Sequence, residues 1–174
     1  RPNRQRRLKV GEEQALFDEL AKCSHSEIVP FVRFALETGM RKSEILGITK
    51  SEINQTPAGY EIIKQDTKNG ERRIIFLSSR AVNAIKHLIE KLKDKSLNEK
   101  LFKITDNQIE INFTKARNKI GSNDLRLHDL RHEAISRLAD KNLSIGDLSN
   151  QSGHKSMQTL LRYVNVSERN IREK

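Results

Sequence analysis

Apolar side chains recur at helical spacing in two stretches near the start of the chain, after Gly11 and again from Ser26. Gly39 follows the second stretch and is a predicted C-terminal cap, because glycine adopts a left-handed conformation there without steric cost. Two helices are therefore predicted before residue 40. Their apolar faces comprise Leu16, Phe17 and Leu20 in the first and Ile28, Val29, Val32, Ala35 and Leu36 in the second.

The period changes between residues 48 and 77, where short stretches rich in β-branched residues replace the helical pattern. Turn-forming residues separate these stretches, and Asn69-Gly70 is a dipeptide that favours a tight hairpin. We expect a small antiparallel sheet of three strands. The predicted strands are Ile48–Ile53, Tyr60–Lys64 and Arg72–Leu77.

Helical spacing returns after Ser78 and Ser79, either of which is a predicted N-terminal cap. Apolar residues at positions 81, 85, 88, 89 and 92 form the face of a first helix. Shorter helices are predicted near residues 107–120, 129–140, 144–150 and 156–163. The fold class is therefore α+β, mostly α-helical with a small three-stranded antiparallel sheet.

Charge points to a nucleic-acid partner. The 174 residues fit one domain of ordinary size, and 33 Lys and Arg against 23 Asp and Glu leave a net charge of +10. Five of these positive charges lie in residues 1–9, which are predicted to be a basic linker. Few aromatic side chains are available for stacking on bases, which disfavours an RNA-binding domain.

The sequence predicts a reducing, cytoplasmic location and no membrane contact. It has no apolar run long enough for a signal-peptide core or a membrane span. Its one cysteine, Cys23, has no partner for an internal disulfide and is predicted to lie at a helix end without a chemical role.

Three basic motifs precede a tyrosine. They are Thr-Gly-Met-Arg-Lys-Ser-Glu at residues 38–44, Leu-His-Asp-Leu-Arg-His at 127–132, and Ser-Gly-His at 152–154, with Tyr163 nine positions after the last histidine. A guanidinium suits two-pronged contact with phosphate oxygens. Taken alone, each motif also has a purely structural interpretation, such as an Arg41–Glu44 ion pair or a tyrosine in the core.

An Arg, a His-x-x-Arg, a His and a Tyr in this chain order resemble the tyrosine recombinases, the phage-integrase family, over nearly the whole chain. The resemblance implies the catalytic-domain fold of that family and assigns six catalytic positions. Tyr163 is the nucleophile, and a lysine on the hairpin protonates the departing sugar oxygen, with Lys68 favoured over Lys64. The residues that hold the phosphate are Arg41, His128, Arg131 and His154, with Glu44 and Asp129 as supports.

The resemblance further implies that DNA is cleaved and rejoined through a 3′-phosphotyrosyl bond, without a metal ion or other cofactor. The partner is double-stranded DNA, on which the full-length protein forms a homo-oligomer, a tetrameric synapse, whereas this fragment is expected to be monomeric. Residues 10–174 then form the catalytic domain, residues 1–9 are the remnant of an interdomain linker, and the N-terminal core-binding domain is absent from this chain. A bacterial or phage origin is implied.

Other functions remain possible on sequence alone. A type IB topoisomerase shares this chemistry, although its chain is longer and its motifs contain fewer arginines. A catalytically inactive DNA-binding module would keep the fold but would not need all six positions filled. A zinc site formed by His128 and His132 is disfavoured, because the positive charge of Arg131 between them repels a metal ion.

Overall fold

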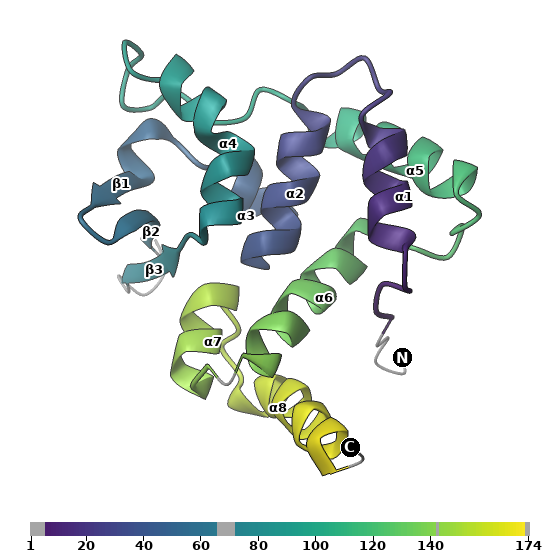
Figure 1. The fold of residues 1–174 in the computed structure, drawn as a ribbon. Helices are drawn as coiled ribbons and strands as arrows, with labels where there is room; N and C mark the ends of the chain where they lie inside the picture. The colour runs from purple at the N-terminus through teal and green to yellow at the C-terminus, as the bar shows by residue number, and fades with distance from the viewer. Residues whose placement is uncertain (1–5, 66–71, 142, 173–174) are drawn as a thin grey trace.

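The computed structural model describes residues 6–65, 72–141 and 143–172. Figure 1 shows a helical body, a small sheet beside it, and a pair of helices below that contains the C-terminal one. None of the described helices is both long and apolar enough to cross a membrane. The elements in chain order are α1 (Glu12–Leu20), α2 (Ile28–Thr38), α3 (Lys42–Leu46), the 3₁₀ helix η1 (Lys50–Glu52), β1 (Ile53–Thr56), β2 (Gly59–Gln65), β3 (Arg72–Phe76), α4 (Ser79–Lys91), α5 (Asp106–Lys119), α6 (Leu127–Asp140), α7 (Ile145–Ser152) and α8 (Met157–Arg172).

The sheet is antiparallel and three-stranded, as the sequence predicts, and its strand order is β1-β2-β3. Ile62 on the middle strand is the register partner of Ile53 on one side and Ile75 on the other. Ile62 and Ile75 are fully buried, so the face that carries them packs on the helical body. The two outer strands each pair with β2 alone, and the sheet is anchored to the core through these isoleucines.

The predicted first strand, Ile48–Ile53, is wrong. Thr49 forms an isolated bridge with Lys100, and the backbone around it pairs with residues 99–101 instead of the sheet. The chain then turns through η1, where the Glu52 carboxylate accepts the Thr49 N–H at 3.0 Å. Strand β1 begins only at Ile53 and ends at Thr56. β-Branched composition does not distinguish a strand from a short extended segment that pairs elsewhere.

Helix α2 is the centre of the main core. It packs against both α4 and α6, so it buries more than the single apolar face that its spacing predicts. Phe31 and Phe34 are fully buried and lie 5.3 and 6.1 Å from the ring of Phe102. Gly39 ends the helix with a φ of 66°, as expected for its C-terminal cap. The position of this helix end matters for the site described below.

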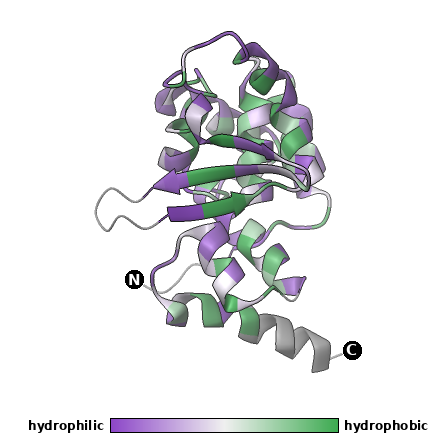
Figure 2. Ribbon diagram, turned by 90° about the vertical axis from the view of Figure 1, so that its left-hand side faces the viewer, coloured by the Kyte–Doolittle hydropathy of each residue, from purple (hydrophilic) through white to green (hydrophobic). Residues whose placement is uncertain are grey.

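Helix α6 connects the main core to a second, smaller one. Leu130, near its start, belongs to the main core, whereas Ile135 and Ala139 pack with Leu148 of α7 and Leu160 of α8. Helix α7 also contacts β3, where the Gln151 side chain exchanges two hydrogen bonds with the backbone of Phe76 at 3.2 and 3.0 Å. Figure 2 shows the sheet between the upper helices and this lower pair.

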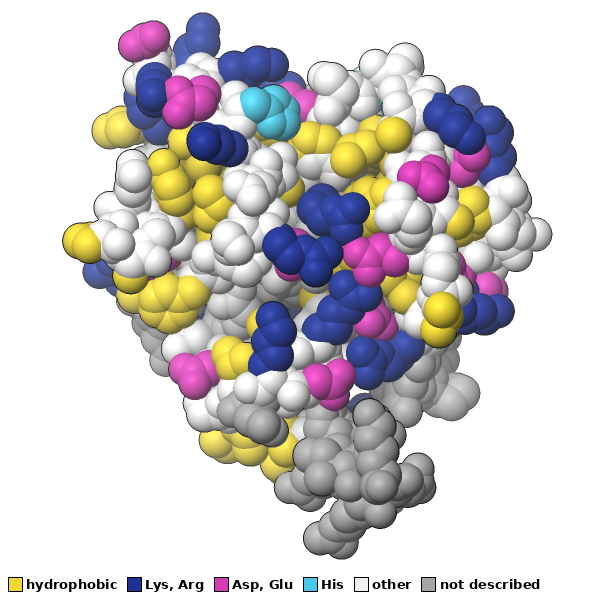
Figure 3. All heavy atoms as spheres, in the orientation of Figure 1, with side chains coloured by type: hydrophobic (Ala, Val, Ile, Leu, Met, Phe, Trp, Pro, Cys, Tyr) yellow, Lys and Arg dark blue, Asp and Glu magenta, His cyan; other side chains and the backbone are white. Residues whose placement is uncertain are grey.

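Two arginines of the predicted linker are held by ion pairs. The Arg6 side chain is only 10% exposed and contacts Glu12 at 2.5 Å and Asp124 at 3.1 Å. Arg7 contacts Glu133 of α6 through two hydrogen bonds of 3.1 Å. Figure 3 shows basic and acidic side chains interleaved across the middle of the face drawn there. The Arg7 contacts therefore fix the described part of the segment against the helix that carries His128, Asp129 and Arg131.

We expect Glu12→Gln to destabilise the fold in a pH-dependent manner. The hydrogen bond from Arg6, opposed by burial and helped by Ser122, lowers the pKa of Glu12 from its ordinary 4.5 to about 2. A carboxyl with a lowered pKa stabilises the fold above pH 4.5, and this contribution is lost as the pH falls from 4.5 to about 2. Urea unfolding at neutral pH should show a loss of about 1–3 kcal/mol.

The difference between Glu12→Gln and the unchanged chain should shrink as the pH falls through this window. Glu90→Gln is the control, because Glu90 is an exposed partner of Lys93 and surface pairs contribute little. Equal losses for the two variants, or a loss for Glu12→Gln that does not depend on pH, would contradict the expectation.

Candidate phosphate-binding and nucleophilic site

Arg131 is a buried cation at the junction of three helices. Its side chain lies on the first turns of α6 and is only 5% exposed. One terminal nitrogen donates to the Gly39 carbonyl at 2.7 Å, and the other donates to the Ser152 carbonyl at 2.8 Å. These acceptors are the ends of α2 and α7, where helix carbonyls carry partial negative charge. Burial, and next the charge of Arg41, lower the pKa of Arg131 to about 10, so it stays protonated at neutral pH.

Arg41 reaches the same turn from another side. It is exposed, precedes α3, and donates to the Gly153 carbonyl at 3.1 Å. Its own N–H donates to the Glu44 carboxylate at 3.1 Å, and its guanidinium donates to the same group at 3.2 Å. Two guanidinium groups distant in sequence therefore converge on consecutive carbonyls, those of Ser152 and Gly153.

Arg73 is a third arginine beside the 152–153 turn, and the sequence alone predicts no role for it. It extends from β3 and makes a bidentate contact with Glu44, with both hydrogen bonds at 3.0 Å. Burial raises the pKa of Glu44, but the hydrogen bonds and charges of Arg73 and Arg41 outweigh that effect, and the net pKa is lowered. Glu44 is therefore an anion that contacts two arginines, Arg41 and Arg73.

Gly153 lets these groups approach the turn. It ends α7 with a φ of 67°, and a Cβ added there would overlap a terminal nitrogen of Arg73. The same Cβ would lie 3.2 Å from Arg41. A glycine is needed here both for its backbone conformation and for the space that the arginines occupy.

His154 follows this glycine and contacts Arg131. Its Nε2 lies 3.5 Å from an Arg131 nitrogen, and its Nδ1 lies 2.8 Å from the Ser152 hydroxyl. Burial, followed by the charges of Arg131 and Arg41, lowers the pKa of His154 to about 4. The imidazole is therefore neutral at neutral pH.

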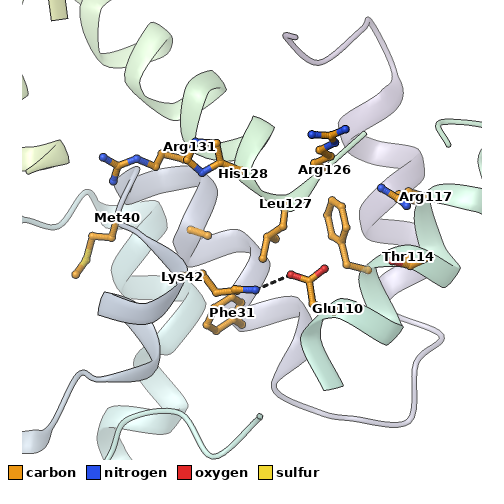
Figure 4. A pocket seen from close by; sticks show the side chains of 12 residues that line it. Phe31, Met40, Lys42, Glu110, Thr114, Arg117, Arg126, Leu127, His128 and Arg131 are labelled. Carbon is orange, nitrogen blue, oxygen red and sulfur yellow. Dashed lines mark hydrogen bonds and ion pairs between the residues drawn. The ribbon is translucent and has the colours of Figure 1, made fainter. Parts of the chain in front are cut away.

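His128 lies one helical turn before Arg131 on α6, and it is exposed. Desolvation by the surrounding chain and the charge of Arg131 lower its pKa. Figure 4 shows the two side chains next to each other at the edge of a cavity of about 300 Å³. The cavity is also lined by Lys42, Arg117 and Arg126, so its rim is basic. The Asp129 carboxylate accepts the Arg126 N–H at 2.8 Å at the start of α6.

Tyr163 projects from α8 into the same cluster. It is half-buried against the second core, and its ring centroid lies 6.5 Å from that of His154. Burial raises the pKa of Tyr163, although the positive charges of Arg131 and Arg162 oppose this effect. Its hydroxyl lies 2.5 Å from Nδ1 of His132. On sequence alone His132 was considered only as a metal ligand, and this contact was missed.

Five of the six predicted catalytic residues therefore lie in one cluster, and the sixth, Lys68, lies outside the described residues. Lys64, the other candidate lysine, is on β2 and forms an ion pair with Glu52 at 2.8 Å. Within the described part of the chain, no group of three or more His, Cys, Asp and Glu is placed to hold a metal ion. The cluster can bind an anion with several charged oxygens beside an un-ionised phenol.

The chain is similar to proteins that act on DNA. A family model described as the phage integrase family matches residues 6–170. A "Shufflon-specific DNA recombinase" of Escherichia coli is 33% identical over 164 residues, which cover 94% of this chain and 41% of that protein. The chain spans about half the length of the curated relatives that it matches.

Two solved structures share the fold. A crystal structure of "XerA recombinase" matches with a TM-score of 0.73 and 21% identity, covering 98% of this chain and 64% of the other. The "catalytic domain of bacteriophage HP1 integrase" matches with a TM-score of 0.65 and 24% identity, covering 91% and 86%. The predicted α+β class, mostly helical with three antiparallel strands, is confirmed.

We expect Gly153→Ala to cost more stability than Gly121→Ala. Gly121 has a similar φ of 74°, but a Cβ there would have no heavy atom within 4 Å. Gly121→Ala should lower the free energy of unfolding by about 1–2 kcal/mol, the cost of a left-handed conformation for alanine. Gly153→Ala should lose this amount and about 1–3 kcal/mol more, because Arg73 must leave its hydrogen bonds with Glu44. Urea unfolding of both variants tests the difference, and equal losses would show that Arg73 moves freely.

Proposed function

The chain belongs to the phage integrase family, and we propose from this membership that it is the catalytic domain of a site-specific DNA recombinase that works through a covalent protein–DNA bond. The observation that carries the proposal is the convergence of Arg41, Arg131 and His154 on one turn, with the Tyr163 hydroxyl in the same cluster. No single one of the motifs that contain these residues specifies a phosphodiester as the substrate. Together they supply a cationic site and a nucleophile.

In the proposed reaction the Tyr163 oxygen attacks a phosphorus atom of the DNA backbone. A bond forms between the phenol oxygen and phosphorus, and the bond from phosphorus to the 5′ oxygen breaks. The 3′ end is then held as a phosphotyrosyl ester, which keeps the energy of the broken bond for rejoining. We assign the proton for the 5′ oxygen to Lys68, the lysine that the family pattern places on the hairpin.

The charges of the site suit this reaction. Arg131 keeps its proton at neutral pH and is oriented before substrate arrives, so little reorganisation is needed when negative charge develops on phosphorus. His154 is neutral without substrate, and a phosphate placed beside it would raise its pKa and favour its donor form. His128 lies beside Arg131 and is assigned a further contact with the phosphate. Fixed cations of this kind can stabilise the transition state without a metal ion.

We propose double-stranded DNA as the partner, since the Escherichia coli relative is named a DNA recombinase and the chain carries a net charge of +10. Residues 10–174 are the proposed catalytic domain, residues 1–9 belong to a linker, and the full-length protein assembles a tetrameric synapse on DNA. The relatives are bacterial, archaeal and phage proteins, and we infer that this protein acts on DNA in a bacterial cytoplasm.

Tyr163→Phe in the full-length protein should abolish covalent attachment to DNA and leave noncovalent binding nearly unchanged. Only the nucleophilic oxygen is lost, and the ring still packs against the second core. A nicked duplex library with a randomised sequence traps adducts whatever the target sequence is, and denaturing gels then separate them. Chelator in the reaction should not reduce the wild-type yield.

Tyr60→Phe is the matched control, because Tyr60 lies on β2 and should leave adduct formation intact. An adduct formed by the Tyr163→Phe variant would contradict the assignment of the nucleophile. Relaxation of supercoils without exchanged junctions would instead indicate a type IB topoisomerase, and absence of any wild-type adduct would indicate an inactive DNA-binding module.

Arg41→Ala and Arg131→Ala should have non-additive effects on single-turnover cleavage. Both guanidiniums converge on the 152–153 turn and are proposed to hold one phosphate, so either loss should remove most of the rate. The double variant should lose much less than the product of the two single losses. Lys replacements should rescue poorly, because an ammonium cannot make a two-pronged contact. Strictly multiplicative losses would show that the two arginines act on different groups.

A further inference from the structure

His132 makes the shortest contact to the Tyr163 hydroxyl among the described interactions. Its Nδ1 lies 2.5 Å from the phenol oxygen, a distance within the range of a short hydrogen bond. The two rings are nearly parallel, at 23°, with centroids 6.1 Å apart, so they meet through these two atoms and not face to face. The residues are 31 positions apart in sequence and come from different helices, α6 and α8.

The nucleophile needs a proton acceptor. Burial raises the pKa of Tyr163 above its ordinary 10, so the phenol is un-ionised at neutral pH. A phenol must lose its proton as its oxygen bonds to phosphorus, because a protonated aryl phosphate ester is too reactive to accumulate. A phenol can donate its proton, and Nδ1 of a neutral imidazole accepts when the ring proton is on Nε2. In that tautomer the contact runs in the direction that the reaction needs.

We propose that His132 is the general base that takes the Tyr163 proton during cleavage and returns it during rejoining. This role rests on the proposed function. As the phenol oxygen bonds to phosphorus, its proton moves to Nδ1 of His132, and the 5′ oxygen leaves with a proton from Lys68. In the reverse step the 5′ hydroxyl attacks, the phenol oxygen leaves, and the His132 imidazolium gives the proton back.

The other imidazoles of the cluster are less well placed for this transfer. The nitrogens of His154 already contact Ser152 and Arg131. His128 packs edge-on against the His132 ring, with centroids 4.8 Å apart and planes at 90°. The His132 ring thus lies between the His128 ring and the Tyr163 hydroxyl.

The positive charges around the pair favour ionisation of the phenol as the proton leaves. Arg131 faces the pair from α6 and Arg162 lies beside Tyr163 on α8. The neutral rings of His128 and His154 face it from α6 and from the turn between α7 and α8. The arginine charges stabilise a phenolate and so oppose the effect of burial. A base positioned at the hydroxyl then has to accept the proton only at the moment of attack.

Single-turnover cleavage by the full-length protein tests this role. His132→Gln keeps a polar side chain but cannot accept a proton, and its rate should fall by about 10²–10⁴-fold while DNA binding is retained. At pH values below the pKa of the phenol, the cleavage rate of the His132→Gln variant should rise in proportion to the hydroxide concentration. His87→Ala, on the exposed face of α4, is the control and should cleave at the wild-type rate.

Replacing Tyr163 by a fluorinated tyrosine provides a second, more specific readout. A more acidic phenol needs less help from a base, so it should restore much of the rate in the His132→Gln background and little in an Arg41→Ala background. A merely structural role for His132 would predict a loss that depends on neither pH nor the acidity of the phenol. That result would overturn the proposal.

The contact itself can be tested without activity. Nitrogen NMR of the imidazoles should show Nδ1 of His132 as the unprotonated acceptor, and Tyr163→Phe should shift that signal more than it shifts the signal of His87. An unchanged His132 signal would overturn the proposal. If the wild type forms the adduct and His132→Gln cleaves at the same rate, the role of His132 is overturned and the proposed function stands. If the wild type forms no adduct, the proposed function is overturned and the role of His132 with it.

Discussion

The rest of the site depends on one constraint, which is that the buried guanidinium of Arg131 must find acceptors. Removing a cation from water is costly unless hydrogen bonds replace the lost hydration, and here they come from the Gly39 and Ser152 carbonyls at 2.7 and 2.8 Å. These carbonyls belong to the ends of α2 and α7, so one side chain fixes the spacing of three helices. A guanidinium presents several donors in a rigid plane, and the same side chain can therefore hold the scaffold and still face an anion.

The small sheet connects the site to the main core independently of Arg131. Ile62 and Ile75 bury the sheet in the main core, and the same β3 carries Arg73 to the Glu44 carboxylate. The Gln151 amide exchanges two hydrogen bonds with the backbone of Phe76, so α7 is attached to the edge strand β3. The turn at Gly153 is thus placed by the sheet and by Arg131 together.

Sequence was sufficient for features that depend on local spacing, and insufficient for those that depend on distant partners. The helical periods and the cap at Gly39 follow from neighbouring residues, and so does the Arg41–Glu44 pair three positions apart. The strand expected at Ile48–Ile53 was wrong because its backbone pairs with residues 99–101, which no local pattern reveals. Arg73 and His132 were missed for the same reason, since Arg73 meets Glu44 29 positions away and His132 reaches Tyr163 across 31. The motif order located the other site residues only because the family resemblance carries long-range information that spacing alone does not.

The charge balance of the site explains why it is poised for an anion. Arg41, Arg73 and Arg131 converge here, and Glu44 is the one carboxylate that the described contacts place against the first two. Arg131 is oriented by carbonyl dipoles, which direct a cation but do not neutralise it, and its pKa is lowered to about 10. Two histidines are kept neutral by burial and by the same positive field. These pKa shifts reflect repulsion among the positive groups of the cluster, and an anion placed beside them would reduce that repulsion. Under the proposed function, part of the affinity for a phosphate would come from relief of the repulsion around the buried Arg131, so it would be available only to a ligand that carries negative charge where the arginines meet.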